Sequence, residues 1–309
     1  MEHKSNYRDK SRETSYTVAE STTLLPFLLT TIKGKSRNNI KSLLSRKLVT
    51  IDGKPTSQFD TPLTPGQVVT ILSVPAPRQD ALPFPLLYED EHIIVVNKPA
   101  KLLSVANEKE KTRTAYHMVT DYVKNQHIDN RIFVIHRLDR DTSGVLLFAK
   151  EDGLRRAFQD KWNELVVTRR YLAVVDGQPP EESGTVRSFL LENKAHIVYS
   201  APEHRGGKEA VTHYRVLDRR RGCSLLQVDL DTGRKNQIRV HMADLGCPVV
   251  GDKKYGSKGD SPLRRLGLHA QCLSLRHPVT GKVLTFESQM PVEFSRFFPQ
   301  KSPQEGENT

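Results

Sequence analysis

This sequence has few cysteines and no long hydrophobic run. Its 309 residues include only three cysteines, Cys223, Cys247 and Cys272, which are far apart and lack the spacing of metal ligands. Such usage argues against a disulfide framework and a zinc site, and it favours a reducing compartment. No apolar run approaches the roughly 20 residues of a membrane-spanning helix, and the polar start has no signal-peptide core. We therefore expect a soluble, cytoplasmic protein without a bound metal.

Negative charge is also in deficit. The sequence has 47 lysines and arginines against 36 aspartates and glutamates, which gives a formal net charge of +11. A surplus of positive charge favours a polyanionic partner, and nucleic acid is the commonest one. With 309 residues the chain is long enough for one large domain or two ordinary domains with sizeable cores.

Composition divides the chain into segments. Residues 1–14 and 299–309 are polar, and we expect both tails to be disordered. Residues 15–75 have the apolar pattern of a small domain. Prolines crowd residues 76–85 and predict an extended linker, because proline cannot continue a helix or a central strand. Residues 86–298 then form the larger domain.

The small domain should combine helices with a hairpin. Ser36 can cap a helix that buries Ile40 and Leu44, because these two apolar residues are four positions apart and share one helix face. Asp52 and Gly53 form a turn signal between two strand-like runs. We therefore expect a small hairpin or sheet that packs on the helices.

A cluster of basic residues marks the same region. Between residues 33 and 47 there are six lysines and arginines and no acidic residue: Lys33, Lys35, Arg37, Lys41, Arg46 and Lys47. A run of charge usually forms a solvated face, but charges of one sign repel one another unless an external anion compensates them. We therefore expect this cluster to contact the phosphates of a nucleic acid.

The most informative stretch lies in the larger domain, at residues 131–150. Two apolar, β-branched runs, residues 132–135 and 145–148, are typical of buried strands. They bracket nine residues, 136–144, that carry two arginines and two aspartates. A connection that only reversed the chain would need about two to five residues, so the loop indicates a site on a rigid scaffold. The alternative is that the polar side chains of this loop, those of Asp139, Asp141, Thr142 and Ser143, only hydrogen-bond their own backbone in a turn.

Two further residues belong to recognisable elements. Tyr171 lies in a run that alternates like a strand, where a tyrosine usually serves packing. Arg239 falls in the first turn of a helix that should begin after Asn236 and end at Gly246. The helix dipole disfavours a cation there by a few tenths to about 1 kcal/mol, so Arg239 should pair with a carboxylate. The alternative is a surface arginine that faces solvent.

Two other patterns fail as sites. Residues 251–258, GDKKYGSK, come close to a phosphate-binding loop but lack its Gly-Lys-Ser/Thr ending and its strand-loop-helix setting. We therefore exclude binding of a nucleoside triphosphate. His269, Cys272 and His277 have no metal-site pattern, and we interpret them as structural or surface residues.

These segments together resemble the RluA-type family of pseudouridine synthases over nearly the whole chain. The segments that look like family motifs are YEDEHIIVVNKPA, HRLDRDTSGVLLFAK, RRYLAVVDG, GRKNQIRVHMADLGCPVVGDKKYG and LGLHAQCLSLRHP. The succession of HRLD-x-x-TSG and GR-x-x-QIR-x-H is highly specific. The chain departs from the family at Lys101, where glycine is common, and at Lys235 and Asn236, where Thr-His is common. Those departures concern loop shape and RNA contact.

The small domain carries a second resemblance. The segments SRNNIKSLLSRKLVTIDGKP and LTPGQVV are similar to the S-four-type RNA-binding domain. The likeness implies a helix-and-hairpin module that binds RNA through its phosphates. Such a module would anchor the RNA without reading its sequence.

The family resemblance implies roles for single residues. Asp139 corresponds to the catalytic aspartate, Arg239 to the arginine that pairs with it, and Tyr171 to the aromatic residue stacked on the target base. Arg137 corresponds to the arginine that fills the gap left in the RNA by the flipped uridine. Further residues of these motifs expected to bind substrate are His136, Arg234 and Leu268. No cofactor is expected, because the isomerisation involves no redox change.

The expected fold is α+β. A small helix-plus-hairpin RNA-binding domain should precede a larger domain whose mainly antiparallel mixed sheet is flanked by helices. The expected function is that of a monomeric RNA pseudouridine synthase acting on flipped-out uridines of large-subunit ribosomal RNA, or alternatively of tRNA. A catalytically idle RNA-binding or ribosome-assembly factor is the non-enzymatic alternative. A glycoside hydrolase using Asp139 and Asp141 is disfavoured, because neighbouring loop aspartates need not face each other.

Overall fold

The computed structural model describes residues 13–32, 34, 36–45, 48–72, 82–256 and 262–299. These residues fall into two compact units. The first comprises the described residues before Ala81 together with Val119–Arg131, and the second comprises Leu82–Met118 and the described residues from Ile132 onward. Most of the linker expected at residues 76–85 lies outside the described residues.

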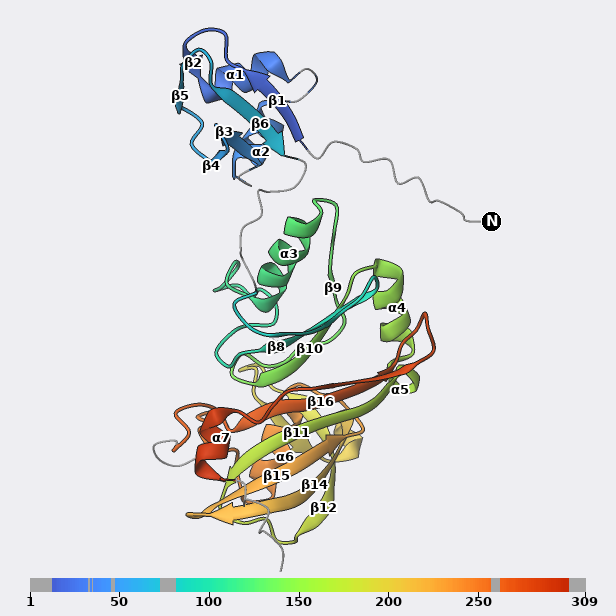
Figure 1. Ribbon diagram of the computed structural model, residues 1–309. Coiled ribbons are helices and arrows are strands. Elements are labelled where there is room, and N and C mark those ends of the chain that lie inside the picture. Colours follow the sequence, from blue (N-terminus) through green and yellow to red (C-terminus); the bar gives the residue numbers. More distant parts are fainter. Residues whose placement is uncertain are drawn as a thin grey trace, which may run out of the picture. The chain divides into compact units, whose positions relative to one another are not determined.

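The first unit is a small sheet with two short helices (Figure 1). Its elements are β1 (Glu13–Thr17), β2 (Thr22–Thr23), α1 (Leu24–Thr31), α2 (Arg37–Ser45), β3 (Val49–Ile51), β4 (Lys54–Thr56), β5 (Pro62–Leu63) and β6 (Val68–Leu72). Four strands form an antiparallel sheet in the order β1-β6-β3-β4, and β2 pairs with β5. The expected combination of helices with a hairpin is confirmed.

Local chemistry accounts for these elements. The backbone N–H of Asn39 donates to the Ser36 Oγ at 3.3 Å, which confirms Ser36 as the cap of α2. Asp52 and Gly53 both have positive φ angles, 48° and 78°, as a two-residue hairpin turn requires. The apolar core beneath includes Leu24, Leu28, Ile40, Leu44, Val49 and Val69.

The second unit is built on one large sheet. In the described residues its main path has the order β13-β12-β14-β15-β11-β16-β10-β8-β7, with β17 on β16 and β9 on β10. Only β10 and β16 pair in parallel there, so the expected mainly antiparallel mixed sheet is confirmed. Its strands are β7 (Leu86–Glu89), β8 (Ile93–Lys98), β9 (Phe133–Val134), β10 (Ser143–Ala149), β11 (Val166–Asp176), β12 (Ser183–Glu192), β13 (Val198–Ala201), β14 (Lys208–Arg220), β15 (Cys223–Leu230), β16 (Leu268–Arg276) and β17 (Val283–Glu287).

Helices cover both faces of this sheet. They are α4 (Asp152–Asp160), α5 (Trp162–Leu165), α6 (Gln237–Asp244), α7 (Val292–Phe297) and a short 3-10 turn (Glu203–Arg205), while α3 (Ala115–Gln126) contributes residues to both units. Successive residues of β11 point to opposite faces. Ala173 packs in one cluster with Ile238 of α6, and Leu172 packs in another with Phe294 of α7. None of these helices, nor any in the described part of the first unit, is long and apolar enough to cross a membrane.

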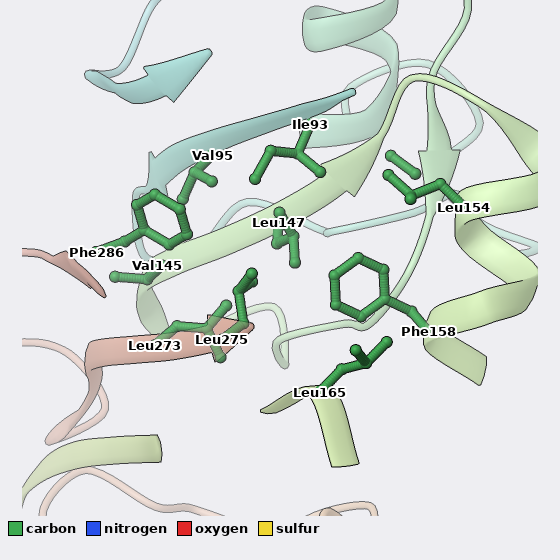
Figure 2. Close-up of a cluster of buried hydrophobic side chains, with 11 residues drawn as sticks. Ile93, Val95, Val145, Leu147, Leu154, Phe158, Leu165, Leu273, Leu275 and Phe286 are labelled. Carbon is green, nitrogen blue, oxygen red and sulfur yellow. The ribbon is translucent and has the colours of Figure 1, made fainter. Parts of the chain in front are cut away.

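A buried cluster beneath β8 and β10 supports the loop between β9 and β10. Figure 2 shows Val95, Leu147 and Phe158 among the side chains of this cluster, which come from β8, β10 and α4. All three are fully buried. Close packing of this kind resists displacement, so the loop that follows β9 rests on a rigid base.

The helical segment that follows β10 is divided at Lys161. The stripe at Leu154, Phe158, Trp162 and Leu165 predicts a single helix, but the backbone leaves the helical region at Lys161, where φ is −120° and ψ is 31°. The apolar residues still contact one core, because α4 and α5 both pack on it. Burial of the stripe therefore does not require a continuous helix.

Candidate active site

A cavity of about 1110 Å³ opens in the second unit. The loop after β9, the middle of β11, the segment between β15 and α6, and the start of β16 line it. Ligand pockets usually measure about 300–1,000 Å³, so this one is large. The seven residues predicted to be catalytic or substrate-binding all line it: His136, Arg137, Asp139, Tyr171, Arg234, Arg239 and Leu268.

The loop that carries Asp139 is held along its length by hydrogen bonds. The Ser104 hydroxyl donates to the carbonyl of Leu138 at 2.7 Å and accepts from its N–H at 3.0 Å. Where the loop enters β10, the Ser143 Oγ contacts the His269 Nδ1 at 2.8 Å and accepts a hydrogen bond from Arg265. These contacts come from residues distant in sequence, so the loop is fixed by the fold rather than by its own turn.

Asp139 points toward Arg239. The Arg239 Nη1 lies 3.3 Å from the Asp139 Oδ2, across 100 positions of sequence. The Asp139 side chain is 36% exposed, which leaves it open to the cavity. The expectation that Arg239 pairs with a carboxylate is confirmed. The Asp139 side chain makes this long-range contact.

Asp252 is the closer partner of Arg239, and sequence reasoning missed it. The Arg239 Nε and Nη2 donate to the two oxygens of Asp252 at 2.7 and 2.8 Å. Such paired hydrogen bonds fix a guanidinium in position and plane. Asp252 is fully buried and also accepts from the backbone N–H groups of Lys254 and Tyr255. The segment GDKKYG, which contains Asp252, belongs to a family motif, but nothing in it indicates that Asp252 is the partner of Arg239.

The charges around Arg239 reinforce its protonation. Burial alone would lower the pKa of Arg239, but hydrogen bonds and charge from Asp252, with a smaller contribution from Asp139, raise that pKa above its ordinary value. The guanidinium also lies 5.1 Å from the ring centroid of Tyr255. Arg239 therefore remains a cation that is shared between two carboxylates.

Asn236 precedes α6 as predicted, but it does not cap the helix with its side chain. Its backbone is left-handed, with φ 57°, and its amide contacts Arg239 and Tyr255 instead. The Arg239 Nη1 donates to the Asn236 Oδ1 at 3.0 Å. The prediction that the Asn236 side chain caps α6 is therefore wrong. That side chain orients Arg239 instead. The predicted helix end is confirmed, since Gly246 follows α6 with φ 76°.

Tyr171 lies on β11 where the sheet is irregular. Its neighbours across the sheet are Val228 and Ala270, and the register with β16 shifts between Arg170 and Tyr171. Such irregularities re-aim side chains beside sites. Burial, opposed by Arg169 and helped by Asp139, raises the pKa of Tyr171 to about 12. The phenol is therefore neutral near pH 7.

The other predicted substrate residues line the cavity in different environments. His136 accepts a hydrogen bond from the N–H of Leu147, and burial lowers the pKa of His136 to about 4, so the imidazole is neutral. Arg137 is exposed. Arg234 donates to the carbonyl of Glu209, and Leu268 is buried at the start of β16. Six arginines and lysines line the cavity against two aspartates, a balance that favours an anionic ligand.

Lys98 is a second residue that sequence reasoning missed. Its side chain is fully buried, and its Nζ donates to the carbonyls of Pro99, Leu102 and Arg140 at 3.0, 2.7 and 3.2 Å. Burial lowers the pKa of Lys98 to about 7, against the opposing effect of Asp141. Because Arg140 adjoins Asp139, Lys98 ties β8 to the loop that carries it.

The basic cluster of the first unit is described only in part. Arg37 and Lys41 are exposed on α2. The other four predicted members, Lys33, Lys35, Arg46 and Lys47, lie outside the described residues. No group of three or more histidine, cysteine, aspartate or glutamate side chains within the described ranges could hold a metal ion.

Comparison with known proteins identifies the class of this fold and site. Residues 92–244 match the family model described as RNA pseudouridylate synthase. A Bacillus subtilis protein that is named uncharacterized RNA pseudouridine synthase YlyB is 32% identical over 277 residues, which cover 87% of this chain and 90% of that protein. The chain therefore belongs to the RluA-like family of pseudouridine synthases, and it is an enzyme of that class.

Two more comparisons concern a relative with a named RNA substrate and a solved structure. The ribosomal large subunit pseudouridine synthase D of Zymomonas mobilis is 33% identical, over 74% of this chain and 77% of that protein. Among solved structures, human RNA pseudouridylate synthase domain containing 4 superposes with a TM-score of 0.58 at 23% identity. The match covers 71% of this chain and 94% of that one and bears on the fold alone.

Proposed function

We propose that this enzyme converts specific uridines of large-subunit ribosomal RNA to pseudouridine, with Asp139 as the catalytic residue. The observation that carries the proposal is the Asp139 carboxylate, open to the cavity and 3.3 Å from the Arg239 guanidinium. The assignment to ribosomal RNA rests on the relatives named ribosomal large subunit pseudouridine synthase C and D.

The reaction requires a carboxylate beside the ribose. The bond from N1 of the base to C1′ of the sugar breaks, the base rotates, and a bond forms from C5 to C1′. The C5 proton is then lost to solvent, and N1 takes up a proton from solvent, so no atom is gained or lost overall. Asp139 either attacks C1′ as a nucleophile or removes a ribose proton to give a glycal. Both routes need the ionised acid, which the cationic Arg239 stabilises. Reactant and product are isomers, so we propose no cofactor.

Entry of the uridine into the cavity requires flipping it out of the RNA stack. Extrusion of a base costs a few kcal/mol. Stacking on Tyr171, which lines the cavity beside Asp139, would offset part of that cost. Arg137 is exposed at the same cavity and would fill the gap left in the RNA.

The first unit would serve as an RNA anchor of the S-four type. The exposed Arg37 and Lys41 support this proposal, because they extend from α2 without acidic residues nearby in sequence. Contacts of lysine and arginine with phosphate add affinity that does not depend on sequence. The anchor would hold the RNA while the second unit selects the uridine.

The proposal is tested by mapping pseudouridines in ribosomal RNA and tRNA from cells that lack the protein. We expect one or a few positions of large-subunit RNA to lose the modification and to regain it when the wild-type gene is restored. Loss at tRNA positions instead would overturn the assignment to ribosomal RNA.

The same cells separate an enzyme from an assembly factor. Restoring the gene with Asp139→Asn should leave the missing positions unmodified. If the variant restores growth and ribosome assembly fully while the positions stay unmodified, the essential function of the protein is assembly rather than modification.

A further inference from the structure

The cavity extends beyond Asp139 to the only tryptophan of the chain. Trp162 is half-buried at the break between α4 and α5, and it lines the cavity together with Phe158, Gln159 and Asn163. These residues have no role in the isomerisation described above. The volume of about 1110 Å³ exceeds the usual range of about 300–1,000 Å³ for the pocket of one drug-sized ligand. Space therefore remains next to a uridine placed between Asp139 and Tyr171.

The Trp162 ring is fixed by its neighbours. Its centroid lies 5.7 Å from that of the neutral His136 and 6.5 Å from that of Phe158. The guanidinium carbon of Arg169 lies 5.7 Å from the Trp162 ring centroid, and Arg169 is held in turn by the carbonyl of Asp231. Fixed aromatic rings and guanidinium planes are the surfaces on which unpaired bases stack.

Two amide side chains stand on the same part of the cavity wall. Gln159 and Asn163 are exposed, so each can reach a ligand. An amide offers both a donor and an acceptor, as the edges of nucleobases do. The Gln159 Oε1 accepts a hydrogen bond from Arg155 at 2.6 Å, which orients its NH₂ group as a donor.

We propose that Trp162, Arg169, Gln159 and Asn163 form a second nucleobase site, which takes an unpaired base next to the target uridine of the same RNA. Trp162 and Arg169 supply stacking surfaces, and the two amides contact the base edge. The inference rests on the proposed function in that the ligand is RNA. It adds that the enzyme requires two unstacked bases and reads the second one at this site.

The single tryptophan allows a direct test. The full chain carrying Asp139→Asn is titrated with a single-stranded ten-nucleotide oligouridylate, and with an abasic oligomer of the same length and charge, while tryptophan fluorescence is recorded. We expect the base-bearing oligomer to quench Trp162 and to half-saturate at about one tenth of the abasic concentration, since stacking contributes about 1–3 kcal/mol per base. Equal curves, or no quenching by either oligomer, would overturn the proposal.

Variants of the amides test the same site by affinity. Gln159→Ala combined with Asn163→Ala should weaken binding of the base-bearing oligomer several-fold and leave the abasic oligomer unchanged. Gln178→Ala, at an exposed glutamine outside the cavity lining, is the matched control and should change neither. Weakening of both oligomers by the amide variants would indicate a general electrostatic or folding effect and contradict a base site.

These measurements use a variant that cannot turn over, so they do not depend on pseudouridine formation. Failure of the proposed function would appear as wild-type protein without activity, whatever the fluorescence shows. Failure of the second site would appear as active wild-type protein whose tryptophan does not distinguish the two oligomers.

Discussion

Arg239 is shared unequally between two carboxylates, and the proposed mechanism depends on this difference. Asp252 is fully buried and takes the two short hydrogen bonds, whereas Asp139 is 36% exposed and lies 3.3 Å away. One guanidinium between two aspartates leaves a net charge of −1. The positive charge of Arg239 therefore stabilises the Asp139 carboxylate without covering it, and in the proposed mechanism an oxygen of Asp139 stays available for the ribose.

Replacement of Asp252 by Asn tests this division of roles. The variant keeps the shape of the side chain but loses the charge and one acceptor that hold Arg239. We expect kcat to fall by about a hundredfold with KM little changed, because small displacements of reacting groups cost that much. Asp229→Asn, which breaks the Arg170–Asp229 pair on the same sheet, is the matched control and should retain activity. A change of KM alone in Asp252→Asn would contradict a positioning role.

Some residues of the site could be predicted because their local sequence setting is unusual. Others are recognised only through contacts that the fold makes. Asp139 and Arg239 stand out because a charged loop between strands and a cation in a first helical turn are unusual on local grounds. Asp252 has no such local signal. Its partner lies 13 positions earlier, and only the fold makes their paired hydrogen bonds visible. The link from Lys98 to the loop of Asp139 was hidden in the same way, since Arg140, one of the three carbonyl partners of Lys98, is 42 positions away.

At the scale of elements, the site depends on where β10 begins. Ser143 and Gly144 pair in parallel with His269 and Ala270 of β16, the one parallel contact in the described part of the sheet. Gly144 has φ 116°, and a Cβ there would lie 2.0 Å from the carbonyl oxygen of Ala270. Glycine is therefore required for β10 to approach β16 directly after the loop that carries Asp139.

Gly144→Ala should accordingly destabilise the protein by roughly 3 kcal/mol, from backbone strain and overpacking together. The midpoint of thermal unfolding should fall, and activity should fall with it because the loop is displaced. Gly153→Ala is the matched control, since a Cβ at Gly153 meets nothing within 4 Å and the residue lies in α4. The control should be neutral or stabilising by up to about 1 kcal/mol. Equal midpoints for Gly144→Ala and wild type would refute the steric account.

Most strands could be predicted from their sequences, but the pairing between the strands could not. The apolar run at residues 145–148 lies in β10, as expected. Nothing local indicates that β10 joins β16, because the paired residues Ser143 and His269 are 126 positions apart. The break at Lys161 was likewise invisible, since the apolar spacing from Leu154 to Leu165 fits an unbroken helix equally well.

At the scale of the whole molecule, positive charge in the first unit should govern RNA affinity rather than chemistry. Arg37→Ala combined with Lys41→Ala should weaken RNA binding and reduce the slope of log K against log salt. The slope should become shallower by about 0.7–0.9 for each phosphate contact that is removed. The kcat at saturating RNA should not change. Lys282→Ala, at an exposed lysine of the second unit, should leave the slope unaltered. A lower kcat without a change in salt dependence would contradict the anchoring role.

Acid should destabilise the folded protein through two histidines, the buried His269 and the half-buried His136. Burial lowers the pKa of both His136 and His269 to about 4, from 6.5 when unfolded. Between these values the unfolded chain binds more protons, so the stabilisation present above pH 6.5 is lost as pH falls toward 4. In urea titrations from pH 7 to 5, His136→Gln should lose less stability than wild type. His204→Gln, at an exposed turn, should lose as much as wild type. Parallel losses in all three proteins would contradict this assignment.

Tritium release from RNA labelled at C5 of uridine tests the central claim most directly, because the C5 hydrogen leaves as C5 joins the ribose. Asp139→Asn should release at least about a thousandfold less than wild type while its RNA affinity stays nearly the same. Asp141→Asn, in the same loop but paired with Arg140 at the surface, should remain active. Release by Asp139→Asn at a rate close to that of wild type would contradict the account.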